Sequence, residues 1–154
     1  TEPDMKFDEA LKYGMDLCSR HERCRSEVHE KLEARKISPD NIEKILDLLV
    51  KEKFIDENRY ANAFTGDKLK LNKWGKMKIR LMLVRKQIPE RVIQHALNQV
   101  DEEDYRQILR EELSKKRRSI KGSNAFEIRG KLFRFATQRG FEPGDIHSLL
   151  DEVV

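Results

Sequence analysis

The sequence predicts an all-α protein of three tandem three-helix repeats, which resemble helix-turn-helix units and stack into an elongated, curved chain. A repeat with a period of about 50 residues is the first observation, because self-similarity of that length is typical of stacked helical arrays. A second is that no segment shows sustained period-two alternation with β-branched residues. The third is a charged fraction of 39% with only seven glycines and four prolines, which favours a surface-rich helical protein. The repeated apolar ladder consists of Val28, Leu32, Ile37, Ile42, Ile45-Leu46, then Ile79, Leu83, Ile88, Ile93, Ala96-Leu97, then Leu132, Ala136, Phe141, Ile146, Leu149-Leu150.

The first repeat is expected to span residues 1–53. Apolar residues at helical spacing predict its first helix over residues 7–20. Ser26 is the expected N-cap of the second helix. Ser38 and Pro39 are expected to start the third, because serine caps a helix well and proline at the first position gives up no hydrogen bond. The expected buried face of that third helix consists of Ile42, Ile45, Leu46, Leu48 and Leu49.

The second repeat is expected to span residues 54–100. Asp56 is the predicted N-cap of its first helix, and Gly75 falls in the short connection to the next. Pro89 is expected to start the third helix of this repeat. The core face is expected to include Tyr60, Ala61, Phe64, Ile79, Leu83 and Val84, with Leu69 and Leu71 as further candidates.

The third repeat is expected to span residues 101–154. Acidic residues 101–104 suit a helix start, because the helix dipole is positive there. The connection at residues 119–124 is longer than its counterparts and basic. Gly140 is expected to follow the end of the next helix, and Pro143 to start a last helix. The first helix of this repeat is expected to bury Ile108, Leu109 and Leu113.

The net charge is only +4, but the two signs are segregated along the chain. Acidic residues gather at 40–57 and 101–112, and basic residues at 68–86 and 115–139. Such segregation favours a polyanion or an acidic protein as the partner. The candidate basic surface consists of Lys68, Lys70, Lys73, Lys76, Lys78, Arg80, Lys86, Lys115, Lys116, Arg117, Arg118, Lys121, Arg129 and Lys131, with Arg85 and Arg134 in the same two clusters.

Two interpretations of this surface stand side by side. Cations displace condensed counterions from nucleic acid, and an aromatic such as Trp74 can stack on a base. Alternatively the lysines form a solvated helix face and Trp74 fills the gap between two helices. Recurrence of the cluster in two repeats favours binding for the lysines, whereas packing is the preferred role for Trp74.

The residues predict neither an enzyme nor a metal site, and no cofactor. There is no glycine-rich phosphate loop, no His-Glu-x-x-His and no serine elbow. Paired carboxylates occur at predicted helix starts, where the dipole already explains them. Cys18, His21 and Cys24 have metal-like spacing, but on one helix their side chains would not converge. His95 and His147 are expected on packed helices rather than as catalytic bases.

Two isolated cysteines without a disulfide framework fit a reducing compartment. No stretch approaches the length of a membrane span, and no signal-peptide core is visible at residues 1–7. The expected location is therefore the cytoplasm.

The residues at 54–61 resemble the signature of the RecX regulatory proteins: an aromatic–aliphatic pair, two acids, then Arg-aromatic-Ala. The segments Lys73-Trp74-Gly75 and Lys86-Gln87-Ile88 resemble the next part of that family's pattern, and Arg25-Ser26-Glu27-Val28 resembles its first repeat. Gln87 stands where many members have glycine, and Cys24 replaces a more usual polar residue. The signature residues are Phe54, Ile55, Asp56, Arg59, Tyr60, Ala61 and Gly75.

This resemblance implies a regulator that binds RecA filaments on single-stranded DNA and inhibits their recombinase, ATPase and coprotease activities. It thereby implies a part in homologous recombination, DNA repair and the SOS response. It also implies that the protein has no catalytic site. A monomer that binds single-stranded DNA weakly by itself is expected. The alternative is a direct DNA-binding helical module that acts without a recombinase. For Arg59, an ion pair to an acid of the first repeat and a contact with the partner remain open.

Overall fold

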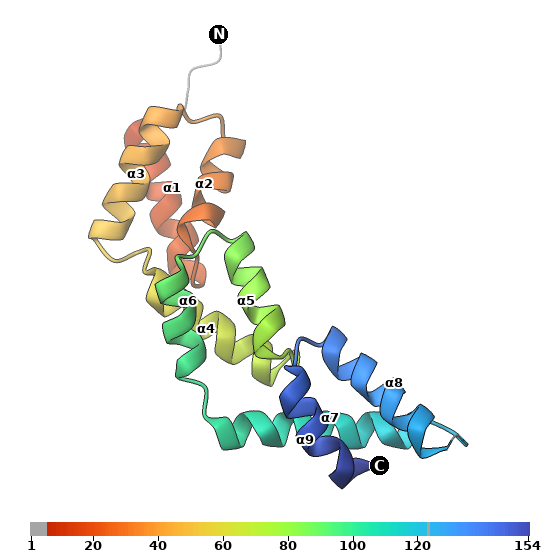
Figure 1. Ribbon diagram of the computed structural model, residues 1–154. Coiled ribbons are helices and arrows are strands. Elements are labelled where there is room, and N and C mark those ends of the chain that lie inside the picture. The colour runs from red at the N-terminus through yellow and green to blue at the C-terminus, as the bar shows by residue number, and fades with distance from the viewer. Residues whose placement is uncertain (1–5, 123) are drawn as a thin grey trace.

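The computed structural model describes residues 6–122 and 124–154, and over these residues the chain forms nine α-helices and no β-strand (Figure 1). The predicted all-α class is confirmed. Each group of three consecutive helices packs as one unit, and the extensive contacts, such as α4 with α6 or α7 with α9, lie within a unit. The helices are α1 (Phe7–Arg20), α2 (Arg25–Ala34), α3 (Pro39–Lys51), α4 (Glu57–Lys70), α5 (Lys76–Arg85), α6 (Glu90–Asn98), α7 (Glu102–Ser119), α8 (Ala125–Gln138) and α9 (Pro143–Val153).

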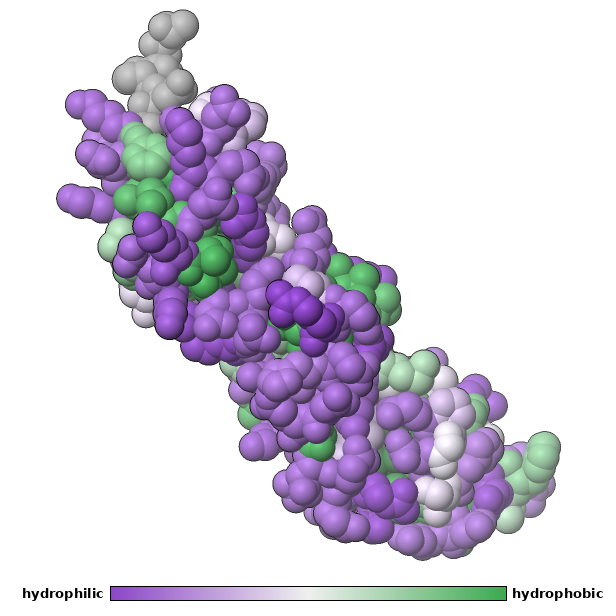
Figure 2. Space-filling model, turned by 60° about the vertical axis from the view of Figure 1, so that its left-hand side comes forward, coloured by the Kyte–Doolittle hydropathy of each residue, from purple (hydrophilic) through white to green (hydrophobic). Residues whose placement is uncertain are grey.

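The three units follow one another along an elongated, bent body, with α1–α3 at one end and α7–α9 at the other (Figure 1). Hydrophilic residues cover most of the face seen in Figure 2. The third unit departs from the repeat in length. Its first two helices have 18 and 14 residues, whereas α4 and α5 have 14 and 10. The α7–α8 hairpin is therefore about one turn longer and projects from the end of the molecule.

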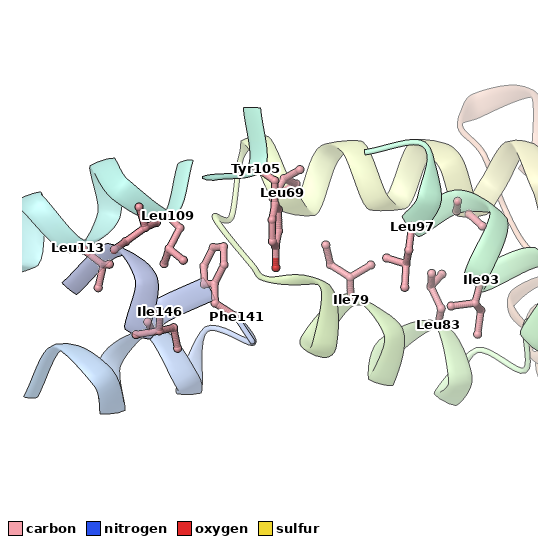
Figure 3. Close-up of a cluster of buried hydrophobic side chains, with 14 of the residues drawn as sticks. Leu69, Ile79, Leu83, Ile93, Leu97, Tyr105, Leu109, Leu113, Phe141 and Ile146 are labelled. Atoms are coloured by element: carbon pink, nitrogen blue, oxygen red, sulfur yellow. The ribbon is translucent and has the colours of Figure 1, made fainter. Parts of the chain in front are cut away.

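The buried side chains form two separate cores. One lies within the first unit and is built around Leu32, Ile45 and Leu46. The other runs without interruption through the second and third units (Figure 3). Tyr105 and Phe141 meet where those units join, with their ring centroids 5.4 Å apart. Because the apolar core is the main source of stability, the second and third units are expected to unfold together.

The second helix of every unit ends in the same way. Lys36, Gln87 and Gly140 have φ values of 61°, 63° and 94°. In each case the following N–H donates back to the carbonyl of the third residue from the helix end, as in Ile88 to Leu83 at 3.1 Å. This is the Schellman motif, in which a left-handed residue lets the chain leave the helix. The repeat of the sequence is thus also a repeat of the backbone.

Several sequence predictions are settled by the helix ends and by burial. Asp56 caps α4 by accepting the Arg59 N–H at 3.0 Å, as predicted. The prediction that Ser26 caps α2 is wrong, because Cys24 occupies the N-cap and Ser26 is already helical. Leu48, Val84 and Leu71 were expected in the core but are exposed. The helical ladder is correct, and these three residues lie beside it on the outer face.

Candidate nucleic-acid interface

The second and third units are joined at the N-terminus of α5. Gly75, its N-cap, has no side chain that could cap the helix. Instead the N–H of Gly75 donates to the Arg139 carbonyl at 2.7 Å, and that of Met77 to the Gly140 carbonyl at 3.0 Å. The Lys76 N–H donates to the Tyr105 hydroxyl at 2.9 Å. Since the first N–H groups of a helix have no partner within it, the third unit here acts as the cap of a helix in the second.

The Tyr105 hydroxyl in turn donates to Glu142 at 2.6 Å, so it connects α5, α7 and the start of α9. Burial and the Glu142 carboxylate raise the pKa of Tyr105, so it stays a neutral donor. The Lys76 ammonium lies 4.6 Å from the centre of the Tyr105 ring and pairs with Glu102 at 2.7 Å. Lys76 is therefore part of the joint between the second and third units.

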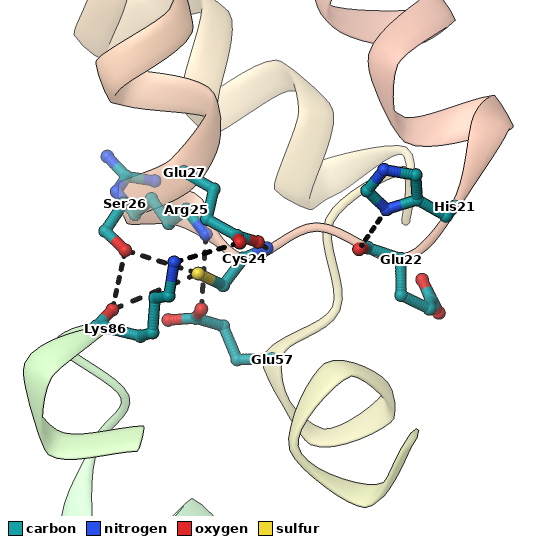
Figure 4. Close-up of polar contacts among 8 residues, drawn as sticks. All are labelled: His21, Glu22, Cys24, Arg25, Ser26, Glu27, Glu57 and Lys86. Atoms are coloured by element: carbon teal, nitrogen blue, oxygen red, sulfur yellow. Dashed lines mark hydrogen bonds and ion pairs between the residues drawn. The ribbon is translucent and has the colours of Figure 1, made fainter. Parts of the chain in front are cut away.

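The first and second units are joined at the equivalent place, the N-terminus of α2 (Figure 4), and this joint too is held by hydrogen bonds and an ion pair. The Ser26 hydroxyl donates to the Lys86 carbonyl at 2.7 Å, and the Lys86 ammonium pairs with Glu27 at 3.1 Å. The Arg25 N–H donates to Glu57 at 3.2 Å. Cys24 is fully buried there, and burial raises the pKa of its thiol. Cys24 therefore packs as a neutral thiol rather than as a reactive thiolate.

The two carboxyl groups at this polar joint have pKa values shifted in opposite directions. Burial would raise the pKa of Glu27, but hydrogen bonds from the Cys24 N–H and from Lys86 outweigh burial and hold it below its usual range. For Glu57, burial outweighs the Arg25 N–H and raises the pKa. Ionisation of Glu27 thus stabilises the joint, whereas burial disfavours ionisation of Glu57.

The candidate cations of the α4–α5 region are mostly engaged within the molecule. Lys76 and Lys86 belong to the two joints, and Arg80 bonds to both Glu90 and Gln94. Lys68 and Lys78 lie 4.9 and 4.5 Å from the centre of the Trp74 ring. Trp74 is half-buried and packs against the core, so it fills the gap between α4 and α5 while holding two lysines. Lys70 ends α4, and Lys73 lies in the following connection.

The candidate cations of the α7–α8 hairpin are arranged differently. A groove of about 620 Å³ runs between the two helices, and no carboxylate lines it. Phe135 lies in it, with the Lys116 ammonium 5.4 Å and the Arg139 guanidinium 4.8 Å from its ring centre. The lining residues are Lys116, Ser119, Ile120, Lys121, Lys131, Arg134, Phe135 and Gln138. Without a carboxylate in its lining, this groove is suited to a polyanion.

The other cations of the hairpin flank this groove. Lys115, Arg117 and Arg118 lie near the C-terminus of α7, whose negative dipole end favours them. Among the described residues, no carboxylate lies within ion-pair distance of these three or of Lys131. Arg129, another of the candidate cations, pairs with Asp151 at 2.8 Å. The predicted surface therefore divides into a structural half on α4–α5 and a more open half on α7–α8.

The sequence analysis missed one feature beside this groove. Phe126 is 86% exposed in the first turn of α8. It lines a second depression with Gly130 and Phe133 of α8 and with His147 and Leu150 of α9. Its signal in the sequence was an aromatic residue outside the repeated ladder, next to a basic connection. That signal is weak, because the exposure of Phe126 depends on how α9 packs against α8.

The signature residues serve the fold. Ile55, Tyr60 and Ala61 are buried, and Gly75 belongs to the joint described above. Arg59 pairs with Glu22 of the first unit and donates to the carbonyls of Lys53 and Phe54 at 3.1 and 3.3 Å. Of the two alternatives for Arg59, the structure contains the ion pair to the first unit. The signature thus specifies how the second unit is attached.

The described residues include no cluster of three or more His, Cys, Asp or Glu side chains placed to hold a metal ion. None of the described helices is long and apolar enough to cross a membrane.

Comparison with known proteins gives matches along most of the chain. Models of the first, second and third three-helix domains of RecX match residues 10–49, 56–97 and 102–150. The regulatory protein RecX of Chlorobium phaeobacteroides (strain BS1) is 31% identical over 99% of this chain and 96% of its own length. That of Clostridium botulinum (strain Eklund 17B / Type B) is 30% identical over 88% of this chain, which spans only 64% of that relative.

Two solved structures share the fold. A crystal structure of regulatory protein RecX superposes with a TM-score of 0.87 at 23% identity, over 94% of this chain and 73% of that one. The crystal structure of RecX from Lactobacillus salivarius gives a TM-score of 0.82 at 21% identity, over 96% of both chains. Fold and surface together define an all-α protein of tandem three-helix units with a basic face at one end. The chain belongs to the RecX family of regulatory proteins.

Proposed function

We propose that this protein binds RecA filaments assembled on single-stranded DNA and inhibits their recombinase, ATPase and coprotease activities, and so regulates DNA repair. The observation that carries the proposal is the match of all three RecX domains, in order, to a chain whose relatives are regulatory proteins. The protein acts as a monomer in the cytoplasm and by binding alone, without catalysis.

The elongated shape supports a steric mechanism. A body of three units in a row can lie along the helical groove of a filament and contact neighbouring subunits, which blocks extension or favours disassembly. Hydrogen bonds hold the units together at both joints, for example from the Gly75 N–H to the Arg139 carbonyl and from the Ser26 hydroxyl to the Lys86 carbonyl. A body that is already ordered loses less conformational entropy on binding than a flexible one.

The charge distribution supports two kinds of contact. In this proposal the open cations of α7–α8 contact DNA phosphates, and the acidic helix starts at Asp56 and Asp101–Asp104 contact basic loops of the filament. The first contact weakens with salt because counterions are released. The second is a contact between proteins, so its strength depends less on the DNA phosphates.

The test is RecA ATP hydrolysis on single-stranded DNA, titrated with this protein at two salt concentrations. Inhibition at substoichiometric amounts that persists at the higher salt is expected for a filament regulator. Absence of any effect at stoichiometric amounts would overturn the proposal.

A second candidate function is a direct DNA-binding module that acts without a recombinase, and the carboxylate-free α7–α8 groove favours it. It predicts inhibition only near saturation of the DNA, which vanishes as salt is raised. The two functions are distinguished by measuring the amount of this protein needed for binding to single-stranded DNA with and without RecA. RecA should lower that amount only if the protein is a filament regulator.

A further inference from the structure

Two surface depressions lie on either side of α8, and Arg134 lines both of them. One is the basic groove between α7 and α8. The other, which we name the aromatic slot, is lined by Phe126, Arg129, Gly130, Phe133, Arg134, His147 and Leu150. A ligand that enters the slot can therefore continue past Arg134 into the groove.

The slot has the form of a stacking site. Phe126, Gly130 and Phe133 follow one another at i, i+4 and i+7, so they share one face of α8. Phe133 is stacked on His147 with ring centroids 4.9 Å apart, which fixes the orientation of one wall. Phe126, almost fully exposed, forms the other. The volume is about 300 Å³. A cavity of roughly 150 Å³ accepts a benzene ring, so one planar base has room.

Glycine at position 130 keeps the floor of the slot open. A Cβ atom built there would contact only the Arg134 guanidinium, at 3.5 Å. Neither backbone conformation nor crowding therefore requires glycine at this helical position. Glycine is also the poorest helix former apart from proline, by about 1 kcal/mol relative to alanine. Because it has no side chain, Gly130 leaves space in the slot for a ligand.

Charge selects the kind of occupant. Arg129 and Arg134 are the charged residues of the slot, and Arg129 is paired with the exposed Asp151 at 2.8 Å. Glu127 is the only carboxylate of α8, and it lines neither depression. The adjoining groove adds Lys116, Lys121 and Lys131. An apolar stacking wall beside a row of cations is how proteins hold single-stranded nucleic acid.

We propose that the aromatic slot binds one base of single-stranded nucleic acid by stacking between Phe126 and Phe133, while the neighbouring phosphates lie against Arg134 and the basic groove. The inference rests on the part of the proposed function in which the α7–α8 cations face DNA. It goes further by naming a base contact, the residues that make it and a preference for single strands. Bases in a duplex are already stacked and cannot enter the slot.

The experiment compares binding of a fluorescent single-stranded oligothymidine with that of an abasic oligonucleotide of equal length and charge, by fluorescence anisotropy without RecA. The phosphates are the same in both, so any difference comes from the bases. We expect the protein to bind oligothymidine about fivefold or more tightly, since one stacked base contributes at least that much. Phe126→Ala should abolish the difference and leave binding of the abasic strand and its salt dependence unchanged.

Two further variants keep this test independent of folding. Gly130→Leu fills the floor of the slot and improves the helix, so it should also abolish the preference for bases without loss of thermal stability. Leu71→Ala is the matched control, because it truncates another exposed apolar side chain, at the end of α4, that lines neither the slot nor the groove. It should leave both affinities unchanged.

Equal affinity of the unaltered protein for the two oligonucleotides would overturn the inference. So would a Phe126→Ala variant that loses inhibition of RecA ATPase but retains the preference for bases, because the slot would then take a protein side chain. A protein that prefers bases yet leaves RecA unaffected supports the slot and overturns only the RecA proposal. The two failures are thus distinguishable.

Discussion

The N–H of Gly75 donates a 2.7 Å hydrogen bond to the carbonyl of Arg139, so the last turn of α8 caps the first turn of α5. The two residues belong to different units, and neither has a side chain in the bond. The close approach needs glycine, because a Cβ on Gly75 would lie 2.3 Å from the carbonyl carbon of Gly140. This contact couples the second unit to the third.

Gly75→Ala is expected to lower the free energy of unfolding by about 2 kcal/mol or more, because the backbone of the third unit must move away and three capped N–H groups lose their partners. Urea denaturation measures it. Gly66→Ala is the matched control, since a Cβ there meets nothing within 4 Å. It should be neutral or stabilise α4 by up to about 1 kcal/mol. Equal stabilities of the Gly75 variant and the unaltered protein would refute the coupling.

Gln87→Gly is expected to raise the free energy of unfolding by about 0.5–1 kcal/mol. Gln87 has a φ of 63°, a conformation that costs a non-glycine residue about 1–2 kcal/mol and that Gly140 adopts without strain in the next unit. Part of the gain is offset by the greater entropy of glycine in the unfolded chain. Gln87→Ala serves as the control, because alanine keeps the strain. Thermal unfolding of the unaltered protein and of both variants measures the effect. A glycine variant no more stable than the alanine variant would contradict the prediction.

Glu27→Gln is expected to cost about 0.5 kcal/mol at pH 7, because it removes the half-exposed ion pair with Lys86 but leaves a side chain that can still accept the Cys24 N–H. The folded pKa of Glu27 lies below its unfolded value, so its contribution is present above the unfolded pKa of about 4.3 and is lost as the pH falls through the folded pKa. Denaturation at pH 7 and pH 3 should show the difference shrinking. A constant difference would contradict it.

The opposite pH dependence is expected at Glu57. Its folded pKa is raised, so its contribution is complete below the unfolded pKa and is lost as the pH rises through the folded one. Glu57→Gln should therefore stabilise the protein relative to the unaltered chain at pH 7 and lose this advantage at pH 3. The reverse trend in denaturation midpoints would refute the burial argument.

Arg59→Ala is expected to cost about 1–2 kcal/mol, more than Glu22→Gln, which should cost about 0.5 kcal/mol. The ion pair between them is partly exposed and contributes little, whereas the guanidinium also bonds to the carbonyls of Lys53 and Phe54. A double-mutant cycle measures the coupling. If Arg59→Ala abolished inhibition of RecA while stability stayed unchanged, Arg59 would be a partner contact instead.

Lys115→Glu and Lys76→Glu are expected to fail in different ways. Lys115 is exposed and forms no ion pair with a described carboxylate, so its reversal should weaken DNA binding and lower the salt slope by about 1 or more without loss of stability. Lys76 pairs with Glu102 at the joint, so its reversal should destabilise the protein. Fluorescence anisotropy measures DNA affinity and urea denaturation measures stability for both variants. Equal changes in affinity and stability for the two variants would contradict the division of the basic surface.

Prediction from sequence succeeded where the signal is local. Helix faces follow from residues three or four positions apart, so Leu32, Leu83 and Leu132 could be placed in the core without knowing any tertiary contact. Caps made by a residue's own side chain, such as Asp56, were likewise readable. The start of α5 was not, because its cap comes from the third unit.

The repeat, the all-α class, the family resemblance and the two basic clusters can all be identified from the order of the amino acids. The folded arrangement is needed to tell which cations pair within the molecule and which face outward. Lys76 and Lys115 both belong to the basic clusters of the sequence, but Glu102 pairs with Lys76 and no described carboxylate pairs with Lys115. The folded arrangement also decided that Phe126 stands beside Arg134 and α9. Charge pairing and exposure depend on groups far apart in the chain, so a local pattern cannot encode them.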